Sequence, residues 1–172
     1  MASIDQKIRQ IQDAAFPLFS RYGLRKTAMQ DIAREAGISR ASLYLSFCSK
    51  DEVFRSLSAR LHEEVMDRVE AEFAAQAPAL ERIERALAAF TLGLTAPITG
   101  SPHGQELFDA NMALAADITA AAKAKLLAGV ERVLAEACEA GEIELAGASP
   151  GELAGMIVSA ADGFKHAGEP VA

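Results

Sequence analysis

The chain has 172 residues, of which 51% are apolar and only 6% aromatic, and its net charge is −7. This length suits one core, or a small module joined to a medium-sized domain. Abundant alanine and scarce aromatic and β-branched residues favour helices over sheet. The apolar runs are short and broken by charges, which excludes a membrane span. The N-terminus has no apolar signal core, so a cytoplasmic location is expected.

The charge is distributed unevenly along the chain. Residues 1–60 hold ten Lys and Arg against six Asp and Glu, a balance of +4, whereas the remaining residues hold seven against eighteen, a balance of −11. A basic head on an acidic body is expected when only the head meets phosphate groups. Cys48 and Cys138 belong to no cluster with metal-ligand spacing, so we expect reduced thiols, no metal site and no cofactor.

Residues 4–22 are predicted to form the first helix, which Gly23 ends. Pro17 lies inside this pattern and predicts a kink, because an interior proline removes a backbone hydrogen bond. The predicted apolar stripe consists of Ile4, Ile8, Ile11, Ala15, Leu18, Phe19 and Tyr22.

Residues 27–50 are predicted to form two short helices joined by a tight turn. Thr27 is the expected N-cap of the first helix, and Ser39 that of the second. Gly37 supplies the left-handed conformation that ends a helix. Leu43 and Phe47 lie four residues apart and point inward. This is a helix-turn-helix pattern whose outward face, carrying Ser39, Arg40, Ser42 and Tyr44, suits the major groove of DNA.

The same stretch resembles the DNA-binding domain of tetracycline-repressor-like (TetR family) regulators. The matching residues are Thr27, Ile32-Ala33, Ala36-Gly37-Ile38-Ser39, Leu43-Tyr44, Phe47 and Lys50-Asp51-Glu52, within a match from about Ile8 to Leu57. The chain departs from the family at Ser46, which removes a possible phosphate contact. It also departs at Arg40-Ala41, which bears on the bases that are read.

The resemblance implies an all-α protein. A three-helix helix-turn-helix DNA-binding head (1–48) would precede a helical ligand-binding and dimerisation domain (49–172). It also implies a final dimerisation helix after Phe164, so the chain either lacks that helix or is truncated before it.

The apolar spacing predicts further helices after the head. A long helix capped by Ser49 runs to about residue 75, followed by helices over 80–95, 104–115 and 117–140. Residues 96–103 are predicted to be a loop, since they contain two prolines and a glycine. Pro150 is expected at the first position of the last helix, which includes Phe164.

Arg40 is the best candidate for reading a base, because a guanidinium can bind O6 and N7 of guanine together. Ser39 and Ser42 can reach bases or phosphates, and Ala41 shares the reading helix. Tyr44, Lys50 and Thr27 resemble phosphate contacts of the family. The alternatives are that Thr27 and Ser39 are only caps, that Tyr44 is partly core, and that Arg40 and Lys50 are solvated charges.

The candidate ligand pocket draws on the middle helices and the loop between them. At helical spacing its apolar residues could equally be plain core, and a loop histidine could be exposed to water. His62 and His166 are expected at the surface. The pocket candidates are Phe90, Leu94, His103, Phe108, Met112, Leu127 and Val130.

The resulting hypothesis is a one-component transcriptional regulator, a homodimeric repressor released from a palindromic DNA operator by an unknown small molecule. An enzyme is the first alternative, but the sequence has no catalytic His/Asp/Glu cluster, nucleophile motif or phosphate loop. The second alternative is a helical protein-interaction or ligand-binding module that keeps the fold without specific DNA binding.

Overall fold

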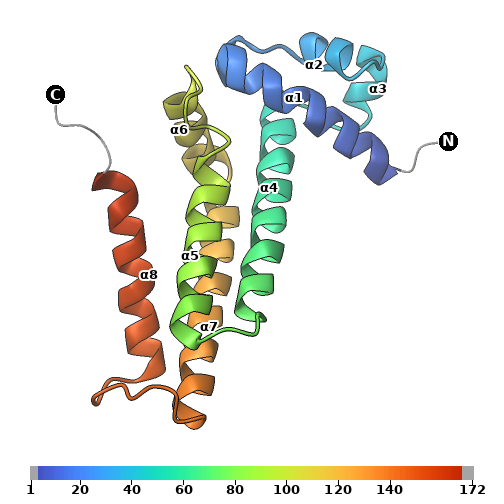
Figure 1. Cartoon of the computed structure of the whole chain (residues 1–172). Coiled ribbons are helices and arrows are strands. Elements are labelled where there is room, and N and C mark those ends of the chain that lie inside the picture. Colours follow the sequence, from blue (N-terminus) through green and yellow to red (C-terminus); the bar gives the residue numbers. More distant parts are fainter. Residues whose placement is uncertain (1–3, 168–172) are drawn as a thin grey trace. The chain divides into compact units, whose positions relative to one another are not determined.

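The computed structural model describes residues 4–167 and their side chains as far as residue 162, so Phe164 and His166 lie outside the described side chains. This part of the chain contains eight helices and no strand, which confirms the all-α prediction (Figure 1). None of these helices is both long and apolar enough to cross a bilayer. The helices are α1 (Ile4–Lys26), α2 (Met29–Glu35), α3 (Arg40–Tyr44), α4 (Lys50–Phe73), α5 (Ala79–Thr95), α6 (Gly104–Leu114), α7 (Ala116–Glu139) and α8 (Pro150–Ala167).

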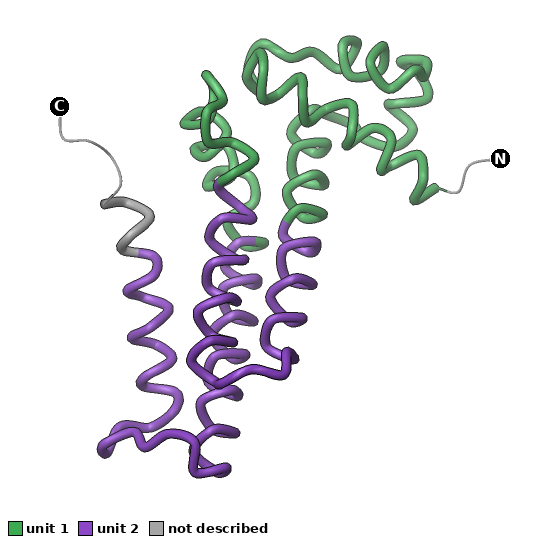
Figure 2. The backbone as a smooth tube through the Cα atoms, in the orientation of Figure 1, with its two compact units in different colours: residues 1–61, 96–118 green, residues 62–95, 119–172 purple. Residues whose placement is uncertain are grey.

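The chain divides into two compact units, unit 1 with residues 1–61 and 96–118 and unit 2 with residues 62–95 and 119–172 (Figure 2). This division differs from the predicted boundary at residues 48–49. The difference arises because α6 packs into the core of the head, where Leu107 is buried and Leu114 is partly buried. Sequence spacing does not reveal that packing, since α6 lies more than 50 residues beyond the head.

The core of unit 1 joins α1 to the helix-turn-helix and to the first turns of α4. The rings of Phe19 and Phe54 meet edge to face, with centroids 5.8 Å apart. The ends of the predicted apolar stripe on α1, Ile4 and Tyr22, are exposed. The buried residues include Ile11, Ala15, Phe19, Leu24, Met29, Ile32, Ala33, Leu43, Phe47, Val53, Phe54, Leu57 and Leu107.

The predicted helix ends agree with the structure at most positions. The helical dihedral angles of α1 break at Gly23 (φ 82°) and not at Pro17, where we predicted a kink. Ser49 caps α4, because its hydroxyl accepts the N–H of Glu52. Ser149 and Glu152 form a reciprocal capping box at the start of α8, with Pro150 as its first residue. These capping hydrogen bonds hold the pKa of Glu152 below its usual value.

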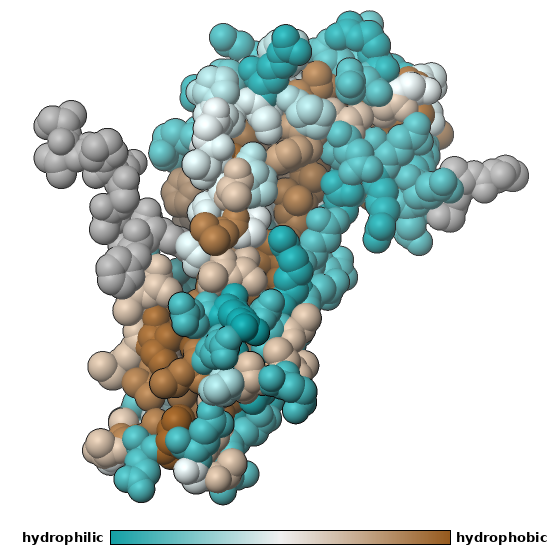
Figure 3. All heavy atoms as spheres, viewed as in Figure 1, coloured by the Kyte–Doolittle hydropathy of each residue, from teal (hydrophilic) through white to brown (hydrophobic). Residues whose placement is uncertain are grey.

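The core of unit 2 is formed by α5, α7, α8 and the second half of α4. The exposed large apolar residues of unit 2 include Leu80, Leu92 and Met156. Apolar side chains gather on the face of this unit that is drawn in Figure 3. The buried residues include Val65, Met66, Val69, Phe73, Ala79, Ile83, Ala86, Phe90, Ala122, Leu126, Val130, Val133, Leu134, Ala137, Ala154 and Val158.

Candidate nucleic-acid interface

The turn between α2 and α3 is closed by two backbone hydrogen bonds. The N–H of Ile38 donates to the carbonyl of Ala33 at 3.0 Å, and that of Gly37 donates to Arg34 at 3.1 Å. These are the two bonds of a Schellman motif, which requires a left-handed residue between them. Gly37 has φ 65° and a Cβ there would meet nothing within 4 Å. The backbone conformation, rather than lack of space, therefore favours glycine in this turn.

The short helix α3 is fixed at its start and against α1. The hydroxyl of Ser39 accepts the N–H of Ser42 at 3.0 Å, which confirms the predicted cap. The Lys7 ammonium donates to the carbonyl of Ser42 at 2.8 Å, and the Gln10 amide donates to that of Ala36 at 2.7 Å. Five residues are too few to form a stable isolated helix. The contact of Lys7 with Ser42, together with burial of Leu43, holds α3 in place, whereas Gln10 holds the end of α2.

Four of the predicted DNA-binding residues lie exposed on or beside α3. Ser39, Arg40, Ala41 and Tyr44 are exposed, and Ser42 is half-buried. The guanidinium carbon of Arg40 lies 5.4 Å from the centroid of the Tyr44 ring, within the range of a cation–π contact. Tyr44 is 42% exposed, which argues against the alternative that it belongs to the core. α3 thus presents a paired guanidinium and phenol to solvent.

Thr27 is not the cap that we predicted. Ala28 is the N-cap of α2, and the Asp31 carboxylate accepts its N–H at 3.2 Å. The Thr27 side chain is buried, and its hydroxyl donates to the carbonyl of Gly23 at 2.7 Å. A phosphate contact by this hydroxyl stays a prediction, and it would require the hydroxyl to leave that carbonyl.

Lys50, the predicted phosphate contact at the start of α4, also holds the turn before α2. Its ammonium donates to the carbonyl of Arg25 at 2.9 Å and to that of Thr27 at 3.3 Å. An ammonium has three protons to donate. Two are directed at the turn, so Lys50 retains one for a ligand from solvent.

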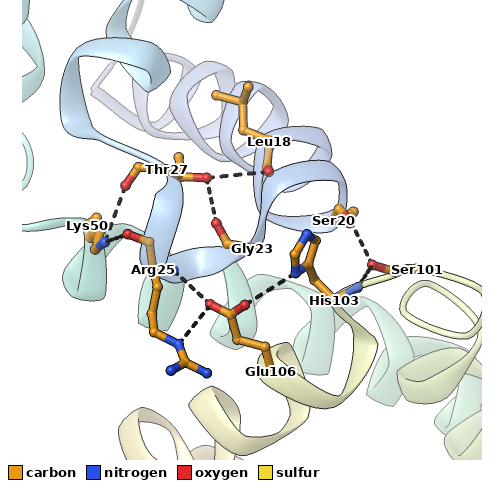
Figure 4. A network of polar contacts seen from close by, with 9 residues as sticks. All are labelled: Leu18, Ser20, Gly23, Arg25, Thr27, Lys50, Ser101, His103 and Glu106. Atoms are coloured by element: carbon orange, nitrogen blue, oxygen red, sulfur yellow. Dashed lines mark hydrogen bonds and ion pairs between the residues drawn. The ribbon is translucent and has the colours of Figure 1, made fainter.

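Glu106, which the sequence analysis missed, holds the same turn from α6 (Figure 4). Its carboxylate accepts the backbone N–H of Arg25 at 2.8 Å and lies 3.3 Å from Nδ1 of His103. The hydrogen bond from Arg25 is the main reason that the pKa of Glu106 lies below its usual value, and charges on Arg25 and His103 act in the same direction. Ser101 adds a bond from its hydroxyl to the carbonyl of Ser20 at 2.7 Å.

The ligand-pocket candidates fall into two groups. Phe90 and Val130 are buried in the core of unit 2, with Leu94 and Leu127 packed against them. Phe108 and Met112 of unit 1 are exposed, and His103 is half-buried against Glu106. A separate open groove of about 640 Å³ lies on the head and is lined by Gln6, Arg9, Gln10, Asp13, Ala14, Glu35 and Ala36.

His62 is buried, contrary to the expectation of a surface residue. Only 7% of it is exposed, and its Nε2 lies 3.1 Å from the hydroxyl of Thr119. The position could have been identified from its spacing, because residues three and seven positions later on α4, Val65 and Val69, are also buried. Both cysteines are free thiols, as predicted, and Cys48 is exposed.

Residues 11–57 match the model of the tetR family of bacterial regulatory proteins (TetR_N). The HTH-type regulator YfiR of Bacillus subtilis, itself described as uncharacterised, is 40% identical over 53 residues, which are 31% of this chain and 26% of YfiR. The matches cover 26% to 44% of the length of the curated relatives, which is less than half of each.

Solved structures match over nearly the whole chain. A TetR/AcrR-family regulator from Thermobifida fusca is 22% identical with a TM-score of 0.71, and the match covers 96% of this chain and 87% of that one. The complex of triclosan with SmeT of Stenotrophomonas maltophilia is 21% identical with a TM-score of 0.66, covering 94% and 79%. The sequence match identifies the head, and the structural matches extend the fold to the remaining helices. Residues 11–57 therefore resemble the DNA-binding head of the tetR family of bacterial regulatory proteins, and the remaining helices share the fold of these solved structures.

Proposed function

We propose that this protein is a DNA-binding transcriptional regulator that acts as a repressor. The observation that supports this proposal best is the exposed Arg40–Tyr44 pair on α3, a helix capped by Ser39 and fastened to α1 by Lys7. A helix fixed in this way can enter a major groove without first paying the entropy of becoming ordered. In this proposal Arg40 reads a base, Ser39, Ala41 and Ser42 approach bases or phosphates, and Tyr44 and Lys50 contact phosphates.

The active form in this proposal is a homodimer. Two heads related by a two-fold axis would occupy successive major grooves about 34 Å apart, and would therefore select a palindromic operator. The exposed apolar residues of unit 2, among them Leu92 and Met156, are compatible with an interface between copies.

Release from the operator would follow the binding of a small organic molecule, as the SmeT–triclosan complex suggests by analogy. The candidate contacts form two separate sets, Phe90, Leu94, Leu127 and Val130 within unit 2, and His103, Phe108 and Met112 within unit 1. The ligand would have to bind the released conformation more tightly than the DNA-bound one, because only differential affinity shifts a population.

The test is a titration of the full chain with a duplex selected by the protein from a random pool, at several salt concentrations. We expect tight binding. The logarithm of the association constant should fall linearly with the logarithm of the salt concentration, with a slope of about 0.9 for each phosphate contacted. Addition of triclosan to the complex then tests release by that compound. Weak binding that is insensitive to salt would instead favour a protein-interaction module that has kept the fold.

A further inference from the structure

Leu45 is the most exposed large apolar residue in the described part of the chain, with 86% of it accessible. It directly follows α3 and keeps helical dihedral angles, φ −70° and ψ −19°. Its N–H donates to the carbonyl of Ala41 at 3.1 Å, which is the spacing of an α-helical hydrogen bond. Leu45 therefore continues the surface of the reading helix for one more position.

The core does not use this side chain. Leu43 and Phe47, on either side of it, are buried and fill the inward positions. Leu45 follows Leu43 by two residues. Because a helix turns by about 100° per residue, the side chain of Leu45 points to nearly the opposite side of the helix from Leu43, away from the core. The sequence spacing of Leu43 and Phe47 could therefore have identified Leu45 as an outward residue.

α3 consequently exposes two rows of different chemistry. Residues four apart on a helix are neighbours on its surface. Arg40 and Tyr44 form one row, which is polar and held together by the cation–π contact. Ala41 and Leu45 form the adjacent row, and both are exposed and apolar.

We propose that Leu45 is a specificity-determining residue that contacts the 5-methyl group of a thymine in the major groove, beside the base that Arg40 reads. This inference rests on the proposed DNA-binding function. Thymine alone among the four bases presents a methyl group in the major groove, and apolar side chains read it by contact. The contact would also remove part of the exposed Leu45 side chain from water, which favours binding.

The experiment uses the full chain and duplexes that it selects from a random pool. Each thymine of the selected site is replaced in turn by uracil, which removes only the 5-methyl group, and affinity is measured for the wild type and for Leu45→Ala. At one thymine position per half-site we expect the wild type to lose about four-fold in affinity, the effect of one methyl group. The Leu45→Ala variant should lose little or nothing at that position.

Leu80→Ala is the matched control, because Leu80 is also an exposed leucine but lies on α5 in unit 2. This variant should keep the full effect of uracil. Failure of the wild type to select any duplex would refute the DNA-binding function itself. Two results would overturn the role of Leu45 alone. In the first, the wild type selects a site but loses no affinity when uracil replaces any thymine; in the second, Leu45→Ala loses as much affinity as the wild type.

Discussion

The carboxylate of Glu106 on α6 accepts the backbone N–H of Arg25, and the N–O distance is 2.8 Å. The Lys50 ammonium donates to the carbonyl of the same residue at 2.9 Å. Two helices that are distant in sequence thus hold both backbone polar groups of Arg25, which lies in the last turn of α1, directly before the turn that leads to α2. The placement of that turn sets where α2 begins, and with it the position of the reading helix.

Replacement of Glu106 by Ala should destabilise unit 1 by about 1 kcal/mol, the net value of one such hydrogen bond. The pKa of Glu106 is lowered on folding. The carboxylate therefore stabilises the fold at pH values above the usual pKa of a glutamate, and this stabilisation is lost as the pH falls through the lowered pKa. The difference in unfolding free energy between wild type and variant should therefore shrink in acid. Glu84→Ala, at an exposed position on α5, serves as control and should leave stability nearly unchanged.

Replacement of Arg40 by Ala should relax the sequence preference of DNA binding. Without a bidentate contact with guanine, discrimination at one position of each half-site should fall by about 1–3 kcal/mol. Competition between single-base variants of the selected duplex measures this discrimination. If Arg40→Ala discriminates as well as the wild type, the assignment of Arg40 as a base reader is wrong.

Replacement of Lys50 by Ala should weaken binding to all duplexes alike. The slope of log affinity against log salt should become shallower by about 0.9 for each phosphate that the variant no longer reaches. Lys50→Arg supplies a comparison, since it keeps the charge while changing the geometry of the bonds to Arg25 and Thr27. If the salt slope of Lys50→Ala is unchanged, Lys50 contacts no phosphate and serves only to hold the turn.

The helix ends were predictable because their signals are local. Gly37 and Ser39 set the turn and the cap through neighbours within five residues, and the Ser149–Glu152 capping box is similarly short-range. Thr27 misled the prediction because its hydroxyl has a competing acceptor, the carbonyl of Gly23, which only the folded turn brings close. A threonine that caps a helix and a threonine that donates to the carbonyl of the preceding turn have the same sequence pattern.

The packing of α6 on the head could not be predicted from periodicity. Glu106 and Arg25 are 81 residues apart, and nothing in the spacing of either helix pairs them. Leu107 is an apolar residue of a short helix, and its sequence spacing carries no information that it completes the core of the head. Local pattern determines each helix, whereas the pairing of faces depends on packing between helices.

A pair of glycine substitutions tests the packing of unit 2. A Cβ on Gly129 of α7 would lie 2.2 Å from the ring of Phe73, whereas one on Gly155 of α8 would meet nothing within 4 Å. Gly155→Ala should stabilise by up to about 1 kcal/mol through helix propensity. Gly129→Ala should instead destabilise by about 1–3 kcal/mol, because overpacking outweighs that gain. Thermal unfolding should therefore shift in opposite directions, and shifts of equal sign would contradict the packing of Phe73 on Gly129.

The junction between α6 and α7 depends on Arg55. Its guanidinium contacts both carboxylate oxygens of Asp117, at 2.6 and 2.5 Å, and donates to the carbonyl of Leu114 at 2.7 Å. One side chain thereby binds the last turn of α6 and the first turn of α7. The bonds from Arg55 are the main cause that lowers the pKa of Asp117 from 3.8 to about 2.

Replacement of Asp117 by Asn should therefore destabilise the protein at neutral pH and have progressively less effect in acid. A carboxylate whose pKa is lowered on folding stabilises the fold above its unfolded pKa, here 3.8, and loses that contribution as pH falls toward about 2. Denaturant unfolding of the wild type and Asp117→Asn at pH 7, 4 and 2 measures the effect, with Asp67→Asn on α4 as an exposed control. High salt should reduce the difference at pH 7, because both partners are accessible to solvent. A difference that persisted unchanged at pH 2 would show that the carboxylate charge is not its source.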